Sequence, residues 1–349
     1  MISKETSAKF ANMSIVCSFF VVCMHVGGEF ARGSAGWWIS EFTRGGVSRI
    51  AVPYFFMASG FFLAGKFSCI DVRDALAIWM CEVRKRVRSL IVPLLIWPII
   101  GMVWAAPFVM VANMLAGRPL SHSIPFLNGV YWPGVGILWF VKFLFVLVLI
   151  SPVLLLLTRK LGKVWLTIAF FLYWCVFTFL DPVRATGPLG WCVYSFSLEG
   201  VAYFSAGMFL REFAVNGFIL PLRKSVCFMV LGLLGVLLSI TCNLLQIPIG
   251  GGNYLNIRHF PVPLVMAGVF GLMPVKRFPE VLVTAAFPVY LMHGMWTVPI
   301  TCILNHVPFI GATSAYLLKW GFGFGMSVLS ASFLRRYVPR VAGVLFGGR

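Results

Sequence analysis

Apolar runs of about twenty residues recur along the whole chain, and they constrain the fold more than any other feature. A helix needs roughly 17 to 25 apolar residues to cross a hydrocarbon core of about 30 Å. The run FMVLGLLGVLLSI, residues 228–240, is continuously apolar and lacks the two-residue alternation of a membrane β-barrel strand. With 60% hydrophobic and 11% charged residues, the 349-residue chain has too few charges to cover a soluble globule. We therefore predict an all-α polytopic membrane protein.

The distribution of these runs predicts a bundle of about ten transmembrane helices. The expected spans are residues 10–30, 47–65, 90–112, 136–157, 164–181, 194–210, 225–244, 258–274, 281–303 and 313–334. Of the 28 Lys and Arg residues, 20 fall on the side of the bundle that holds the N-terminus. Because basic residues gather in cytoplasmic segments, we expect both termini in the cytoplasm. No hydrophilic stretch is long enough for a second folded unit, so residues 1–349 are expected to form one membrane domain.

Neither the net charge nor the cysteine residues indicate a further class of function. This topology explains most of the net charge of +18, so nucleic acid is not expected as a partner, whereas membrane lipids are. The nine cysteines contain no CxxC pair and lie mostly in apolar runs, which is typical of small buried hydrophobic residues. We expect no metal site.

Ionisable side chains at membrane depth are costly, so each is a candidate for function. His25 and Glu29 lie four residues apart at the end of the first span, and on a helix this spacing puts both on one face. A carboxylate bound to one imidazole nitrogen orients the ring and makes the other nitrogen a better base. The alternative is a polar pair at the membrane boundary.

The second span begins with RIAVPYFFMASGFFL, residues 49–63. Arg49 is a candidate clamp for an anion or a hydroxyl group, although an arginine at a membrane boundary commonly extends to lipid headgroups. Ser59 and Gly60 are small enough to allow close approach of another helix.

Five further polar residues belong to the expected spans or their ends. Lys142 and Glu199 lie at similar depth and could form an ion pair. Lys319 is interpreted as a lysine whose ammonium group extends to the interface. Arg258, with His259 beside it, begins the eighth expected span on the outer side, where an acceptor could be held.

Four motifs occur in order along the chain. They are HVGGE at 25–29, RIAVPYFFMASGF at 49–61, LWFVKFLFVLVLISP at 138–152 and VYLMHGMW at 289–296. Together they resemble the hallmarks of the bacterial acyltransferase-3 family, and the resemblance covers essentially the whole chain.

The resemblance implies a multi-pass enzyme of the bacterial cytoplasmic (inner) membrane. Members move an acyl group, usually acetyl from cytoplasmic acetyl-CoA, to a hydroxyl of a cell-surface or lipid-linked carbohydrate, as in O-acetylation of polysaccharides. Acyl-CoA is then the donor substrate, and no cofactor is bound. The family's catalytic residues map to His25, Glu29 and His293. The predicted substrate-binding residues are Arg49, Ser59, Lys142, Glu199 and Arg258.

A basic cluster departs from the family pattern. The family carries an Arg-x-x-Arg pair before its third helix, whereas this chain has VRKRVRSLIVP at 83–93, which places Arg86 and Ser89 at the two positions. Acyl-CoA binding is predicted for Arg84, Lys85, Arg86 and Arg88. Such a cluster can bind phosphates, and it also fits topology or anionic lipids alone.

Two questions stay open at this point. His25 could remove a proton from the acceptor hydroxyl, or it could carry the acyl group transiently. A transporter or flippase of a glycan or an acylated small molecule is the alternative function, because intramembrane His, Glu and Lys residues also form proton relays and substrate paths.

Overall fold

The computed structural model describes residues 2–28, 30–67, 72–131, 136–179, 197–213, 220–250, 253–307 and 309–348, and it is predominantly helical. The helices are α1 Lys4–His25, α2 Ala35–Ser40, α3 Ala51–Ala64, α4 Val72–Arg86, α5 Val92–Leu115, α6 Ser123–Tyr131, α7 Trp139–Leu149, α8 Ser151–Leu161, α9 Lys163–Phe179, α11 Leu198–Phe213, α12 Leu222–Leu245, α13 Val262–Leu272, α14 Glu280–Leu304, α15 Ala312–Tyr337 and α16 Pro339–Leu345. Two short antiparallel strands, β1 Pro248–Gly250 and β2 Asn253–Tyr254, follow α12.

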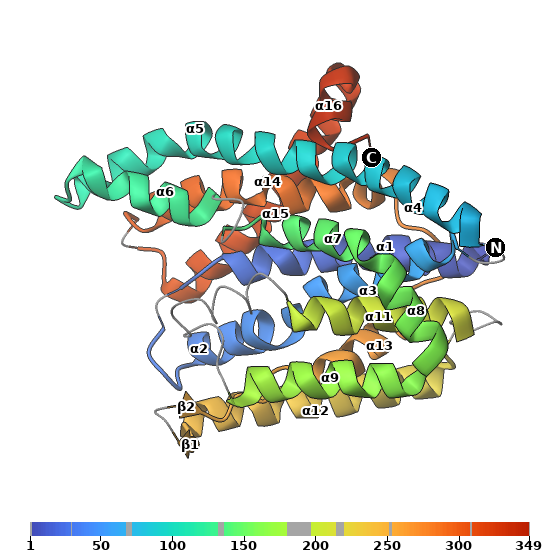
Figure 1. The fold of residues 1–349 in the computed structure, drawn as a ribbon. Helices are drawn as coiled ribbons and strands as arrows, with labels where there is room; N and C mark the ends of the chain where they lie inside the picture. The colour runs from blue at the N-terminus through green and yellow to red at the C-terminus, as the bar shows by residue number, and fades with distance from the viewer. Residues whose placement is uncertain are drawn as a thin grey trace.

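Most of the long helices lie roughly along one direction (Figure 1). Among the described residues, six helical stretches are long and apolar enough to cross a membrane: Lys4–His25, Ala35–Ala64, Asp74–Leu115, Leu222–Leu245, Glu280–Leu304 and Ala312–Tyr337. These six stretches confirm a polytopic helical architecture. Each of the ten expected ranges overlaps a helix, but ten spans and cytoplasmic termini stay predictions.

The fourth expected span is broken. Helices α7 and α8 meet at an angle of 64°, with Pro152 in the first turn of α8. Proline has no backbone N–H and therefore cannot continue the hydrogen bonds of the preceding helix. The hydroxyl of Ser151 donates instead to the carbonyl of Val148 at 2.8 Å. This pair counts as a seventh crossing only if the two helices form one bent span.

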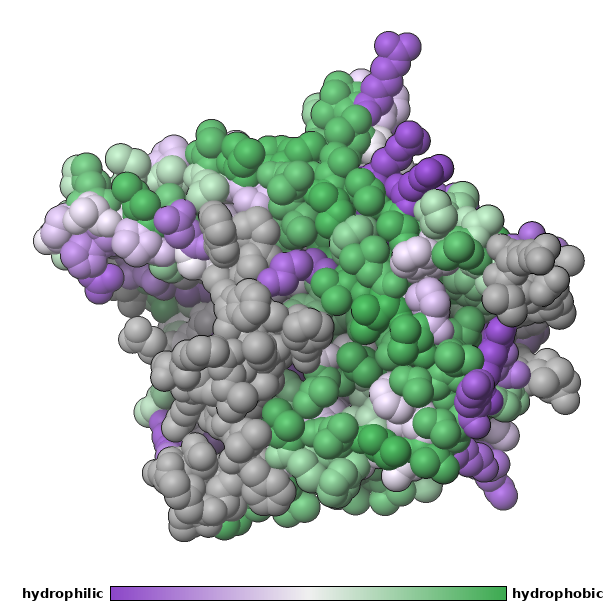
Figure 2. Space-filling model, in the orientation of Figure 1, coloured by the Kyte–Doolittle hydropathy of each residue, from purple (hydrophilic) through white to green (hydrophobic). Residues whose placement is uncertain are grey.

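The surface agrees with a lipid environment. In Figure 2 a broad apolar surface covers the middle of the visible face, and hydrophilic residues gather toward its edges. On α5, Leu95, Ile99 and Val103 follow one another at a spacing of four and are 61%, 62% and 70% exposed. Water would penalise such a row, whereas lipid tails accept it.

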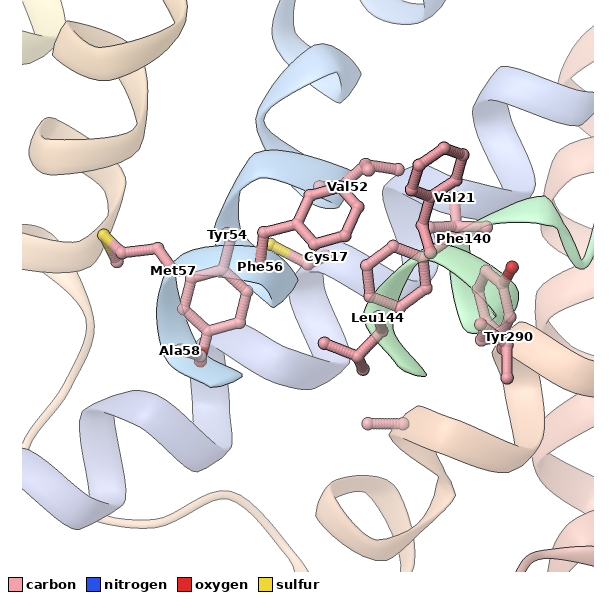
Figure 3. Packing of buried hydrophobic residues seen from close by; sticks show 14 of the residues in the cluster. Cys17, Val21, Val52, Tyr54, Phe56, Met57, Ala58, Phe140, Leu144 and Tyr290 are labelled. Carbon is pink, nitrogen blue, oxygen red and sulfur yellow. The ribbon is translucent and has the colours of Figure 1, made fainter. Parts of the chain in front are cut away.

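Aromatic rings fill the space between α3, α7 and α14 (Figure 3). The ring centroids of Phe56 and Phe140 are 4.7 Å apart, and those of Phe140 and Tyr290 are 5.5 Å apart. All three side chains are buried. Tyr290 also donates its hydroxyl to the carbonyl of Ile137 at 2.7 Å, which satisfies the one polar atom of this packing.

Helices α3 and α11 touch backbone to backbone and run in the same direction, since Phe56 packs on Gly200 near one end and Gly65 lies beside Arg211 at the other. A Cβ at Gly60 would lie 2.0 Å from the carbonyl oxygen of Phe204. The close approach predicted for Gly60 is thus present, and its partner is a second helix of the bundle.

Enlarging the α11 side of this contact tests its importance. A Cβ at Gly207 would lie 1.9 Å from the carbonyl oxygen of Met57, and backbone cannot move aside locally. We expect Gly207→Ala to lower the free energy of unfolding by about 1–3 kcal/mol. The measurement is thermal unfolding of the detergent-purified protein. Gly321→Ala on α15 is the control, because nothing lies within 4 Å of its new Cβ. Equal midpoints for the two variants would contradict the close contact.

Candidate active site

Two histidines from distant parts of the chain meet in the bundle. His25 ends α1 and His293 lies within α14, and their ring centroids are 4.7 Å apart with an interplanar angle of 49°. His293 is fully buried, whereas His25 is exposed to the cavities beside it. The structure therefore brings together two of the three residues predicted to be catalytic.

Main-chain carbonyls fix the tautomers of both rings. His25 Nδ1 lies 2.9 Å from the carbonyl oxygen of Val21, and His293 Nδ1 lies 2.7 Å from that of Tyr290. Because a carbonyl only accepts, each Nδ1 carries the hydrogen, and each neutral ring keeps its lone pair on Nε2. His293 Nε2 is buried and has no hydrogen-bond partner among the described residues. Each ring thus presents one basic nitrogen.

The third predicted catalytic residue, Glu29, lies outside the described residues. Helix α1 ends at His25, and Val26 is already extended, with φ −93° and ψ 135°. The argument that a spacing of four puts His25 and Glu29 on one helical face was therefore wrong, since the helix does not continue to residue 29. The carbonyl of Val21 orients the His25 ring instead.

Two cavities meet at His25. The larger has a volume of about 650 Å³ and lies between the end of α1, the turn after α6, and helices α14 and α15; Thr297, Thr301 and Asn305 are among its polar lining residues. The smaller has a volume of about 230 Å³ and is lined by Arg44, Arg49 and Glu199. His25 and Trp139 line both cavities.

Lys319 was expected to extend to the membrane interface, and this was wrong. The side chain is buried, with 4% of the residue exposed, and its Nζ donates to Asn305 Oδ1 at 3.0 Å. Both residues line the larger cavity with His25. Sequence reasoning missed this because Asn305 follows α14, on a turn whose position the spacing of apolar residues does not predict.

Tyr173, Glu199 and His259 form a chain of hydrogen bonds that reaches the smaller cavity at Glu199. The hydroxyl of Tyr173 donates to Glu199 Oε1 at 2.7 Å and therefore accepts from His259 Nδ1, also at 2.7 Å. Tyr173 and His259 come from α9 and the segment before α13, and both are buried. Tyr173 was not predicted as a site residue, and His259 was named only beside Arg258 at the start of the eighth expected span. Their pairing in space is what the structure adds.

A family model described as an acyltransferase domain matches residues 13–336 of the chain. The chain belongs to this acyltransferase family. No curated protein and no solved structure was found to match it. The protein is therefore an acyltransferase, as the four motifs predicted, and the match includes His25 and His293 and both ends of the bundle.

The opposite end of the acyltransferase holds the predicted donor residues. Arg86, at the end of α4, and Ser59, on α3, line a third cavity of about 230 Å³ together with Tyr290. Arg84, Lys85 and Arg88 are exposed, and Lys85 pairs with Glu82 at 2.9 Å. In Figure 1, α4 lies at the same end of the bundle as the N-terminus.

Ser89 stands where the resemblance predicts the second arginine of the pair, and the packing around it leaves no room for a larger side chain. Its hydroxyl is buried without a partner, and a Cβ at Gly347 would lie 2.4 Å from the Cα of Ser89. The segment after α16 therefore covers Ser89. This packing accounts for a small residue at a position where the acyltransferase family carries arginine.

Three predicted substrate residues, Ser59, Lys142 and Arg258, line neither cavity beside His25. Lys142 Nζ lies 5.9 Å from the centroid of the Phe143 ring, and no ion pair joins it to Glu199, although the structure describes both residues. Arg258 donates from Nη2 to Glu41 Oε2.

Among the described residues, no group of three or more His, Cys, Asp or Glu side chains could hold a metal ion.

Because of these hydrogen bonds, we expect the loss of a hydroxyl group to cost more stability at Tyr173 than at Tyr203, although both tyrosines are buried. Tyr173→Phe leaves Glu199 and His259 without their hydrogen bonds, and we expect it to destabilise the fold by about 1–3 kcal/mol. Tyr203→Phe is the matched control, because the hydroxyl of Tyr203 is buried without a partner. Thermal unfolding in detergent measures both. A Tyr203→Phe loss as large as that of Tyr173→Phe would contradict the assignment.

Proposed function

We propose that this acyltransferase moves a short acyl group, acetyl in the simplest case, from acyl-CoA to a hydroxyl of a cell-surface or lipid-linked carbohydrate. The observation that carries the proposal is the contact between the rings of His25 and His293. A main-chain carbonyl holds the Nδ1 atom of each ring, and the His25 ring lines two cavities. A general base needs a free lone pair and access to the proton that it removes, and His25 has both.

The proposed reaction needs no bound cofactor. His25 Nε2 removes the proton of the acceptor hydroxyl as the hydroxyl oxygen attacks the carbonyl carbon of the thioester. The bond from carbonyl carbon to sulfur breaks, and the leaving thiolate of CoA takes up the proton. The products are the acylated sugar and CoA with a free thiol. His293, in contact with His25, can share the proton while the thiolate leaves.

The donor is proposed to enter from the end of α4. Arg86 supplies a guanidinium for the phosphates of CoA, and the cavity that it shares with Ser59 extends to Tyr290. Tyr290 lies one helical turn before His293 and provides the carbonyl that holds the His293 ring. A thioester threaded along this cavity would thus approach the histidine pair from the side opposite the acceptor. The basic residues at this end favour a cytoplasmic location.

The acceptor is proposed to occupy the larger cavity. Its volume of about 650 Å³ falls within the range of small-molecule sites, roughly 300–1,000 Å³. Thr297, Thr301 and Asn305 offer polar groups for sugar hydroxyls, and Trp139 offers an aromatic ring. Direct attack by the acceptor is preferred here over an acyl-histidine, since the cavity brings the acceptor to His25 itself.

Removing either imidazole tests the proposal. We expect His25→Ala and His293→Ala each to slow acyl transfer by about a hundredfold to ten-thousandfold, because each loses a positioned acid or base. The measurement is transfer of label from radiolabelled acetyl-CoA to glycan in membranes that contain the protein.

The matched control is His306→Ala. This histidine lies just beyond α14 and is exposed, and among the described residues its ring bonds only the carbonyl of Cys302. Full transfer by His25→Ala would exclude the mechanism. Label that remains on acid-denatured wild-type protein, and is lost in His25→Ala, would replace direct attack by a covalent acyl-histidine.

The donor assignment has its own test. We expect Arg86→Ala to raise the KM for acetyl-CoA roughly tenfold with little change in kcat, because it removes a charged hydrogen bond made equally in the ground and transition states. Arg223→Gln, an exposed arginine at the start of α12, is the control. An unchanged KM for acetyl-CoA in Arg86→Ala would contradict the proposed donor entrance.

A further inference from the structure

The smaller cavity beside His25 carries an excess of positive charge. Arg44 comes from the π-helical turn Glu41–Gly46, and Arg49 from the 3-10 turn Val47–Ile50 that leads into α3. Both line this cavity of about 230 Å³ with His25. Glu199 is the single acidic residue among its described lining residues.

Neither arginine is satisfied by the described residues. Arg49 makes no hydrogen bond or ion pair with them, and its Nε is buried without a partner. Arg44 is exposed and donates from Nε to the carbonyl oxygen of Met24 at 3.2 Å, so its Nη1 and Nη2 are available to a ligand. Burying an unpaired guanidinium is costly, so a structure that holds one beside a cavity is suited to an anion.

The nearby carboxylates are occupied by other donors. Glu41 accepts from Arg258 and, at 3.2 Å, from Asn243 Nδ2. Glu199 accepts from Tyr173 at 2.7 Å, which fixes one of its oxygens. Among the described residues that line this cavity, two guanidinium groups therefore face one partly engaged carboxylate, at the wall that also carries His25.

From this geometry we infer that Arg44 and Arg49 form a subsite for an anionic group of the acceptor, a carboxylate or a phosphate. The inference rests on the proposed function, because it treats the smaller cavity as part of the acceptor site. Guanidinium groups bind both anions through paired, charge-assisted hydrogen bonds. The acceptor is thus an acidic carbohydrate whose charge lies in the smaller cavity while its reacting hydroxyl lies at His25.

The test is a binding titration without any acyl donor, so its outcome does not depend on whether His25 performs acyl transfer. The full chain is purified in detergent and titrated by calorimetry with glucuronate, glucose 6-phosphate and glucose. We expect at least one anionic sugar to bind about ten to a hundred times more tightly than glucose. Glucuronate and glucose 6-phosphate distinguish a carboxylate from a phosphate.

Substitutions locate the site. Arg44→Gln is expected to remove the preference for the anionic sugar, and Arg44→Lys to retain part of it, since lysine keeps the charge but loses the planar fork. Arg118→Gln is the matched control, because Arg118 is exposed after α5 and lines neither cavity. Equal binding of glucose and both anionic sugars would overturn the inference. An equal loss in Arg44→Gln and Arg118→Gln would overturn it too.

Thermal unfolding of each variant separates loss of the subsite from loss of the fold. If Arg44→Gln unfolds early, Arg44→Lys decides the question, since its retained preference over glucose supports the subsite and a complete loss in a folded protein argues against it. Failure of acyl transfer in labelled membranes would contradict the proposed function, whereas the titration alone decides the anion subsite.

Discussion

The contact between α3 and α11 positions the rest of the site. Backbone meets backbone at Gly60 and Gly207, where side chains would otherwise separate the two helices. Since the helices run in the same direction, this contact also brings the first turn of α11, with Glu199, near the 3-10 turn before α3, with Arg49, and both residues line one cavity. In a bilayer the hydrophobic effect does little to hold helices against each other, so close packing of this kind must do so. The charge distribution beside His25 is therefore a consequence of two glycines well away from the chemistry.

The sequence predicted the helices well because a membrane leaves few alternatives. Long apolar runs must become helices, and each expected range overlaps one. What the sequence could not predict arises from breaks and turns. Pro152 bends one expected span by 64°, and α1 stops at His25 before reaching Glu29. Catalytic roles for His25 and His293 were predicted from the order of the motifs, and the structure brings the two rings together. Lys319, by contrast, joins the site through Asn305, a partner set by a turn rather than by helical spacing.

The three cavities divide the proposed reaction by location. One cavity begins at Arg86 and reaches Tyr290, and two others meet at His25. Phe140 packs against Tyr290 (Figure 3), and both side chains line the cavity that contains Arg86. A bundle arranged in this way can bind two substrates from opposite ends without joining the two aqueous phases. The histidine pair then stands at the one level that both substrates must reach.

The main-chain bonds of the two histidines have a consequence for how such a protein can diversify. Every residue type supplies a carbonyl, so substitutions at Val21 or Tyr290 leave an acceptor for each imidazole N–H in place. The tautomer of each imidazole is thereby a property of helix geometry and not of a particular neighbouring side chain. Loops and cavity walls can change while the two rings keep the same nitrogen free.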